Sequence, residues 1–269
     1  MEDSFTILER TSSWIKKSIL LKVTGIGIMV CLFLIPAGML QRLVNDRSNS
    51  KNEAISSISK DWGNSQTITG PILTIPYISV KKDNNKILRE RKFAHFLPEK
   101  LVITGEVNPI VRKRGIYKAM LYEASLHISG IHTIPELNTE LLDADEILYD
   151  ESFFEIGIPD MRGIINEVTF NWNGSNFTAE PGLPDYDIVP TGMHIPVNLK
   201  GLPEQTSRPF QCTLNINGSD NISFIPIGKE TSVKISSPWH SPSFSGAFLP
   251  QKRSVSENGF SAEWNILHF

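Results

Sequence analysis

The feature that most constrains this chain is an apolar run from Val23 to Leu40, which contains 18 residues and no charged side chain. As an α-helix with a rise of about 1.5 Å per residue, the run would extend about 27 Å, close to the thickness of a bilayer's hydrocarbon core. The run predicts a transmembrane helix over residues 19–41. A cleaved signal peptide and a buried helix of a soluble protein are the alternatives, and the segment Ala37-Gly38-Met39 fits a signal-peptidase site poorly.

The basic residues around this run bear on its orientation. Four lie on the N-terminal side and three on the C-terminal side: Arg10, Lys16, Lys17 and Lys22 against Arg42, Arg47 and Lys51. Because basic residues near a span favour the cytoplasmic side, the small excess predicts a cytoplasmic tail over residues 1–18. The chain beyond about residue 42 is then predicted to lie on the opposite side of the membrane.

The composition of the whole chain is that of an ordinary globular protein. Charged residues make up 20% of the 269 residues, and 26 basic side chains against 29 acidic ones leave a net charge of −3. This balance argues against intrinsic disorder, and it provides no basic surface for a nucleic acid, so no nucleic-acid partner is predicted. The two cysteines, Cys31 and Cys212, are too few for a disulfide scaffold or a structural zinc site.

The segment after the apolar run is predicted to continue as a juxtamembrane helix over residues 42–63. Ile55, Ile58 and Trp62 are three and four residues apart, which places them on one face of a helix. Gly63 follows them, and glycine is the residue that most often ends a helix.

From Gly70 onward the pattern changes to short segments with β-type composition, about 8–12 residues apart. Two pairs, Asn173-Gly174 and Asn217-Gly218, suit the positive φ angles of tight hairpin turns. One short helix is predicted, over Pro135–Leu142, where Thr133 and Glu136 resemble a capping box. The predicted fold is therefore mainly β: an antiparallel sandwich-like domain over residues 64–269, following one transmembrane helix and one juxtamembrane helix.

Catalytic motifs are absent from the sequence, which contains no H-E-x-x-H, G-x-S-x-G, Walker, C-x-x-C or G-x-G-x-x-G pattern. His127 and His132 could form a metal pair only if the fold brought them together, and the acidic runs 143–146 and 150–151 are typical of solvated loops. The sequence therefore predicts no catalytic residue, no cofactor and no metal site.

The segment Ser236–Arg253 is rich in proline and aromatic residues. Its prolines exclude an interior strand or a helix. One interpretation is a rigid loop that presents Trp239, His240 and Phe244 to a protein partner. The other is a covering loop with Trp239 and Phe248 packed inward.

Several short motifs follow one another in a characteristic order. They are Leu34-Ile35-Pro36, Gly70-Pro71-Ile72-Leu73, Leu97-Pro98-Glu99, Arg162-Gly163-Ile164, Pro181-Gly182, Ser237-Pro238-Trp239-His240-Ser241-Pro242 and Gly259-Phe260-x-Ala262-x-Trp264. In this order the chain resembles the CreD family of bacterial inner-membrane proteins, also called the cell-envelope integrity or colicin-tolerance family.

This resemblance implies an inner-membrane protein with a β-rich periplasmic domain and a role in envelope integrity or stress response. It implies no enzymatic reaction, and the expected partners are the lipid bilayer and other envelope proteins. Members of the family continue into several C-terminal membrane helices, so a chain that stops at Phe269 is expected to be incomplete.

Two other hypotheses remain. The β-rich domain could be a sensor that binds a ligand or partner and reports through the juxtamembrane helix, which would require a pocket. It could also be an unrecognised hydrolase, which would require a cleft with a perturbed carboxylate or histidine.

Overall fold

The computed structural model of the chain describes residues 19–83, 86–140 and 142–268. The predicted cytoplasmic tail, residues 1–18, lies outside the described residues. The chain divides into two compact units, Met1–Ala54 and Ile55–Phe269, which are described separately.

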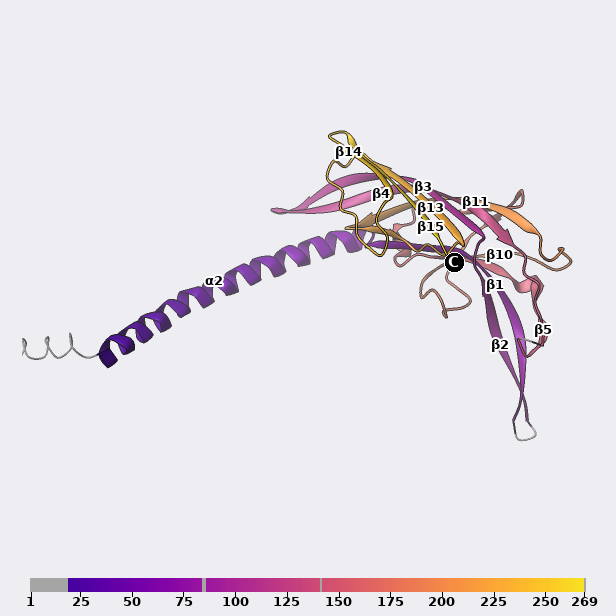
Figure 1. Cartoon of the computed structure of the whole chain (residues 1–269), viewed down its shortest axis with the longest axis horizontal. Helices are drawn as coiled ribbons and strands as arrows, with labels where there is room; N and C mark the ends of the chain where they lie inside the picture. Colours follow the sequence, from indigo (N-terminus) through magenta and orange to yellow (C-terminus); the bar gives the residue numbers. More distant parts are fainter. Residues whose placement is uncertain (1–18, 84–85, 141, 269) are drawn as a thin grey trace, which may run out of the picture. The chain divides into compact units, whose positions relative to one another are not determined.

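Helix α2, Ile19–Trp62, contains 44 residues and includes both predicted helices without a break (Figure 1). Among the described residues it is the one helix long and apolar enough to cross a membrane, and the apolar side chains of its first half are exposed on all sides. Pro36 lies inside it, which is tolerated better in membrane helices than in soluble ones.

The helix ends where the sequence predicts, at Gly63. The backbone N–H of Gly63 donates to the carbonyl oxygen of Ser59 over 2.8 Å, and its φ of 148° is one that side chains with a Cβ rarely adopt. A Cβ at this position would also lie 2.6 Å from the carbonyl oxygen of Asn217. Glycine is therefore required both by the backbone angle and by the close approach of the neighbouring strand.

The second unit is a β domain built from two sheets. The first sheet has the order β12-β1-β6-β10-β9, with β2 and β5 also paired to β1. Its strands are β1 (Gln66–Asp83), β2 (Lys86–Phe96), β5 (Ala144–Ile147), β6 (Phe153–Gly157), β9 (Glu180–Pro181), β10 (Gly192–Pro196) and β12 (Ile222–Phe224). Two 3-10 turns, Tyr149–Glu151 and Met161–Gly163, flank β6. In Figure 1 the β1–β2 hairpin projects away from the rest of this domain.

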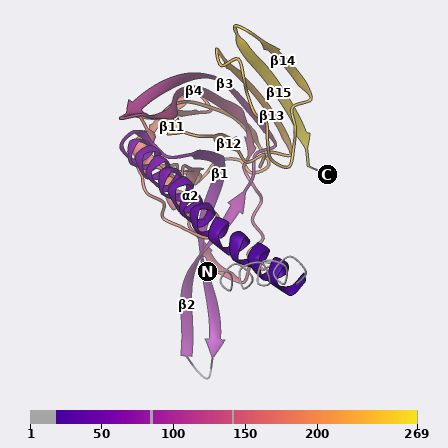
Figure 2. The same ribbon diagram turned by 90° about the vertical axis from the view of Figure 1, so that its left-hand side faces the viewer.

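The second sheet has the order β14-β15-β13-β3-β4-β11-β7-β8. Its strands are β3 (Lys100–Arg114), β4 (Tyr117–Thr133), β7 (Thr169–Trp172), β8 (Ser175–Thr178), β11 (Ser207–Ser219), β13 (Glu230–Ser237), β14 (Lys252–Ser256) and β15 (Gly259–Leu267). Figure 2 shows the strong curvature of this sheet, with β13, β15 and β14 following β3 and β4 toward one edge.

One hydrophobic core joins the two sheets. β4 alternates buried and exposed side chains over much of its length, as expected for a strand with one face on a core. At the centre, the ring of Phe154 on β6 contacts the rings of Phe170 and Trp172 on β7, with centroids 4.9 and 5.3 Å apart. The predicted mainly β, sandwich-like fold is confirmed, although two strand pairs, β1–β12 and β3–β13, are parallel.

The hairpin prediction holds at one Asn-Gly pair and is wrong at the other. Asn173 and Gly174 join β7 to β8, both with positive φ. Asn217 and Gly218 instead lie inside β11, where Gly218 pairs with Tyr122 of β4. A Cβ on Gly218 would lie 2.2 Å from the Tyr122 hydroxyl oxygen, so this glycine allows a ring to approach the backbone rather than forming a turn.

The short helix predicted over Pro135–Leu142 is also wrong, because none of the described residues in that range is helical. Ile134 is buried, its N–H donates to the carbonyl oxygen of Thr206, and its carbonyl oxygen accepts from the N–H of Gln205. These bonds keep the chain extended beside the segment that leads into β11. The pairing across the sheet outweighs the local capping signal.

Candidate functional site

The proline-rich segment that the sequence singles out contains side chains with quite different surroundings. Trp239 is half-buried and His240 is exposed, and their rings stack with centroids 5.4 Å apart. The Trp239 indole N–H donates to the carbonyl oxygen of Ser241 over 2.7 Å. These contacts of Trp239 lie within the loop, and His240 also lines an open hollow of about 430 Å³ with Val255, Ser256 and Glu257.

Phe244 attaches this segment to the sheet, together with the Trp264 indole N–H of β15, which donates to the carbonyl oxygen of Phe248 over 3.2 Å. Its ring meets those of Phe260 and Trp264 on β15 edge-on, with centroids 5.6 and 5.7 Å apart. Phe248, by contrast, is 48% exposed, and Leu249 beside it is 66% exposed. The covering-loop interpretation, with Trp239 and Phe248 packed inward, is therefore wrong for Phe248. Trp239 is only partly buried, so it is not fully packed inward either.

A second group of polar residues lies on the face of the first sheet that points away from the main core. His95 of β2 pairs with Thr74 of β1, which pairs with Phe153 of β6. In an adjacent row, Glu155 of β6 pairs with His194 of β10. Because side chains two residues apart on a strand share a face, these residues all lie on the same side of the sheet.

A loop over residues 182–191 covers this face. Its Leu183 and Val189 form a small apolar cluster with Ile72 of β1, separate from the main core. This cluster holds the loop against the sheet. Asp185 and Asp187 lie between the two attachment points.

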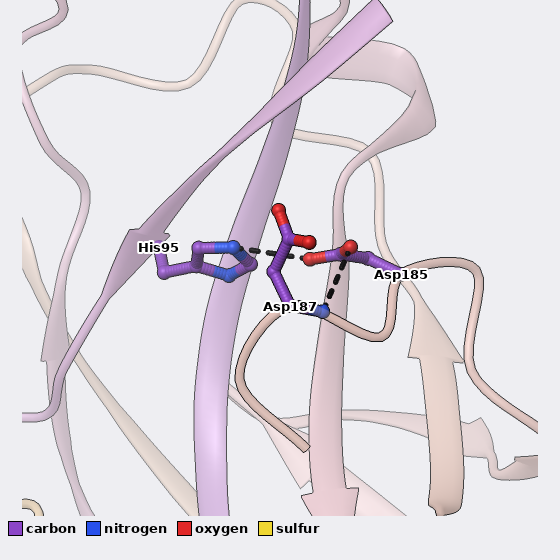
Figure 3. A group of neighbouring side chains, drawn as sticks. All are labelled: His95, Asp185 and Asp187. Atoms are coloured by element: carbon purple, nitrogen blue, oxygen red, sulfur yellow. Dashed lines mark hydrogen bonds and ion pairs between the residues drawn. The ribbon is translucent and has the colours of Figure 1, made fainter. Parts of the chain in front are cut away.

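The loop places two carboxylates next to the histidine (Figure 3). The Nε2 atom of His95 is 3.1 Å from Oδ2 of Asp185, and the backbone N–H of Asp187 donates to Oδ1 of Asp185 over 3.1 Å. One ligand atom from each of His95, Asp185 and Asp187 lies within 4.8 Å of the other two. The other ring nitrogen of His95, Nδ1, is 3.0 Å from the Thr74 hydroxyl oxygen.

The protonation equilibria of this cluster reflect its burial. Burial raises the pKa of Glu155 to about 7, assisted by the negative charge of Asp185 and opposed by a hydrogen bond from Thr74. Burial also lowers the pKa of His95, while Asp185 and Asp187 act in the opposite direction. The site thus combines several carboxylates and one imidazole in a poorly solvated place.

Three buried atoms of the cluster have no hydrogen bond: Nε2 of His95, Oδ2 of Asp185 and Oε1 of Glu155. The first two lie 3.1 Å apart and form an ion pair when His95 is protonated, but they do not form a hydrogen bond. Buried polar atoms are normally hydrogen-bonded, so unpaired ones gathered in one place mark a site that can accept a cation or a proton.

Sequence reasoning did not find this cluster, because about ninety residues separate His95 from Asp185 and Asp187. The D-x-D spacing of the two aspartates is the one local signal that could have pointed to it. The acidic runs that the sequence singles out lie elsewhere: Asp145 pairs with Arg89, and Glu151 pairs with Arg91. His127 and His132 lie on opposite faces of β4, one exposed and one buried, so they do not form a pair.

Comparison with known proteins identifies the family. A family model described as "Inner membrane protein CreD" matches residues 18–269. The inner membrane protein CreD of Escherichia coli K12 is 31% identical over 259 residues, which cover 95% of this chain and 57% of the E. coli protein. The chain therefore spans just over half the length of that relative.

Among solved structures, an M1 zinc metallopeptidase from Deinococcus radiodurans aligns with 62% of this chain and 38% of its own, at 7% identity and a TM-score of 0.29. That similarity is too low to indicate a shared fold. The family match, which extends over almost the whole chain, confirms the resemblance seen in the ordered motifs. The chain belongs to the CreD family of inner membrane proteins.

Proposed function

We propose that this chain forms the membrane anchor and the β-rich periplasmic domain of a protein that contributes to cell-envelope integrity or envelope stress response, without catalysing a reaction. The observation that carries the proposal is the exposure of the apolar part of α2 on every side. A helix of this composition loses about 25 cal/mol for each Å² of apolar surface left in water, and a bilayer removes that loss. The relative in E. coli is named as an inner membrane protein and not as an enzyme.

The proposed topology has residues 1–18 in the cytoplasm, residues 19–41 in the bilayer, and residues 42–63 as the juxtamembrane part of α2. Residues 64–269 are then periplasmic. The excess of basic residues on the N-terminal side of the span supports this orientation.

Fusions of two reporters after Lys60 test the topology. We expect an alkaline phosphatase fused there to be active, because that enzyme forms its disulfides only outside the cytoplasm. A cytoplasmic fluorescent reporter at the same position should be dark when exported unfolded. Fusions after Lys17 serve as the matched control and should give the reverse pattern. Phosphatase activity after Lys17 and none after Lys60 would overturn the proposed orientation.

The proline-rich segment is the surface that we propose for contact with another envelope protein. Trp239, Phe248 and Leu249 leave aromatic and aliphatic area in solvent, and such residues are typical of interface centres. Phe244 fixes the segment on β15, so the surface does not have to be ordered when a partner binds.

Complementation of a strain without the chromosomal gene tests both the function and this surface. We expect the deletion to lower survival in a detergent and chelator challenge at least about tenfold, and the full-length gene to restore it. Phe248→Ala combined with Leu249→Ser should not restore it, although the β domain should lose less than about 1 kcal/mol of stability, as is usual for surface positions. Ile225→Ser, which changes another exposed apolar residue, is the matched control and should restore survival.

The outcomes separate the two parts of the proposal. A deletion strain that survives like its parent contradicts the envelope role. A double variant that is folded and restores survival fully contradicts only the role of the loop.

A sensor function is the second candidate, and the way α2 ends favours it. The Trp62 indole N–H donates to the carbonyl oxygen of Tyr122 over 3.3 Å, and the Arg112 guanidinium lies 5.3 Å from the centre of the Trp62 ring. Asn64 donates through its backbone and side chain to the Asp160 carboxylate, which also pairs with Arg162. These contacts hold the end of the helix, so a change in the β domain can reach it.

The hydrolase hypothesis finds a perturbed carboxylate in Glu155, but that side chain does not meet the other requirement. Glu155 is 1% exposed beneath the loop over residues 182–191 and cannot contact a substrate. Glu155 therefore gives no support to an enzymatic activity.

A further inference from the structure

We propose that His95, Asp185 and Asp187, with Glu155 beneath them, form a binding site for one divalent transition-metal ion of the Zn²⁺ or Mn²⁺ type. The donor set is one imidazole nitrogen and carboxylate oxygens. Zn²⁺ accepts both kinds of ligand, and the carboxylates also suit Mn²⁺. This inference is independent of the envelope role.

The spacing of the ligand atoms suits such an ion. A metal ion about 2.0–2.2 Å from each of its ligands holds those ligands roughly 3–4 Å apart. In this chain the ligand atoms of His95, Asp185 and Asp187 already lie within 4.8 Å of one another. Only a small contraction of the loop toward β2 is needed to close the site.

The buried atoms without hydrogen bonds are a second and separate observation. Asp185 is 7% exposed and Glu155 is 1% exposed, and one oxygen of each, together with Nε2 of His95, has no hydrogen bond. In the described part of the chain, no lysine or arginine forms an ion pair with Glu155, Asp185 or Asp187. A divalent cation would supply the positive charge and the coordination that these atoms lack.

Thr74 orients the histidine for this role. When His95 donates its Nδ1–H to the Thr74 hydroxyl oxygen, Nε2 presents its lone pair toward Asp185. A hydrogen bond that fixes the ring in this way is typical of metal-binding histidines. Thr74 is therefore a positioning residue of the proposed site.

The site also has an entry path. Asp187 is exposed and the His95 side chain retains 15% of its accessible surface, whereas Glu155 and Asp185 lie deeper. An ion can reach the outer ligands from solvent without unfolding of the sheet. The small apolar cluster of Ile72, Leu183 and Val189 keeps the loop in place.

Metal titration of the full chain, purified in detergent micelles, tests the proposal. Calorimetry with ZnCl₂ and MnCl₂ is expected to show one ion per chain for at least one of the two, and no comparable binding of MgCl₂. Asp187→Asn and Thr74→Val should each weaken that binding by about 10–100-fold, the usual effect of removing a ligand or its orienting partner. His95→Gln should weaken it at least as much.

Matched controls distinguish this site from adventitious binding at surface groups. Asp150→Asn changes an exposed aspartate on the 3-10 turn before β6, and His127→Gln changes an exposed histidine on β4. Both should bind like the unaltered chain. Circular dichroism checks that each variant is folded, and Asp187→Asn should fold because Asp187 is exposed.

Two results would overturn the proposal. One is the absence of Zn²⁺ and Mn²⁺ binding at micromolar concentrations. The other is binding that Asp187→Asn and His95→Gln leave unchanged, or that the two controls weaken equally. Neither result would affect the envelope role, whose test is survival of the deletion strain.

Discussion

Phe154→Ala is expected to lower the free energy of unfolding of the β domain by about 3–5 kcal/mol, the usual cost of removing a fully buried aromatic ring. Phe154 is 0% exposed and contacts rings on two other strands: Phe170 and Trp172 of β7 and His132 of β4. β6 belongs to the first sheet, whereas β4 and β7 belong to the second. The substitution therefore opens a cavity where the two sheets meet, and β-sheet backbones relax little to fill it.

Urea denaturation of the full chain in micelles measures the effect, with tryptophan fluorescence as the signal because Trp172 touches the altered position. Phe248→Ala is the matched control. That ring is 48% exposed, so the loss should stay below about 1 kcal/mol. Equal losses for the two variants would mean that Phe154 does not join the sheets.

The second large effect is a loss of stability in acid that depends on His132. This side chain is 1% exposed, and its Nε2–H donates to the carbonyl oxygen of Pro71 over 3.1 Å, while Nδ1 has no hydrogen bond. Burial lowers the pKa of His132 to about 4, and the bond to Pro71 and the charge of Glu99 oppose this shift only in part. Arg208, which stands opposite on β11, offers no acceptor for a second ring N–H.

The direction of this pH effect follows from the different pKa values of His132 in the folded and unfolded chain. In the unfolded chain the pKa of a histidine is near 6.5, so the unfolded state binds the proton first as the pH falls. The contribution of His132 to stability is complete above about pH 6.5 and is lost progressively down to about pH 4. The full loss amounts to about 3.5 kcal/mol, at roughly 1.4 kcal/mol for each unit between the two pKa values.

Comparison with His132→Phe isolates this effect. The phenyl ring fills similar space among Phe154 and Phe210 but does not titrate. The variant loses the bond to Pro71 and should be less stable at pH 7.5. However, the difference between the two proteins should shrink as the pH falls toward 4.5, because only the unaltered protein loses the contribution of His132. The other titrating groups are present in both proteins, so their effects cancel in the difference. A difference that stays constant with pH would show that His132 does not cause the acid sensitivity.

Several features of this protein could be predicted from the sequence because local physical chemistry decides them. Eighteen consecutive uncharged residues can hardly be anything other than an apolar helix, and α2 includes them. Gly63 ends that helix, since few other residues adopt its φ. The turn at Asn173-Gly174 and the mainly β class likewise follow from short-range preferences.

Other features depended on which distant segments meet. Asn217-Gly218 has the same two residues as the turn at 173–174, but its backbone pairs with β4 and leaves no freedom to turn. The capping signal near residue 135 is overridden by the bonds of Ile134 to residues 205 and 206. Each of these local preferences is worth about 1 kcal/mol or less, which is smaller than the loss from unpaired buried backbone groups.

The cluster of His95, Asp185 and Asp187 is the clearest feature that only the tertiary structure decided. The sequence determined that the chain has an apolar helix long enough to cross a membrane, a β domain and the motifs of its family. It could not place a histidine of β2 beside two aspartates of a loop about ninety residues later. That contact exists because Leu183 and Val189 pack on Ile72 and hold the loop over the sheet. Burial under the loop then changes the pKa of His95 and Glu155, which no local pattern of residues encodes.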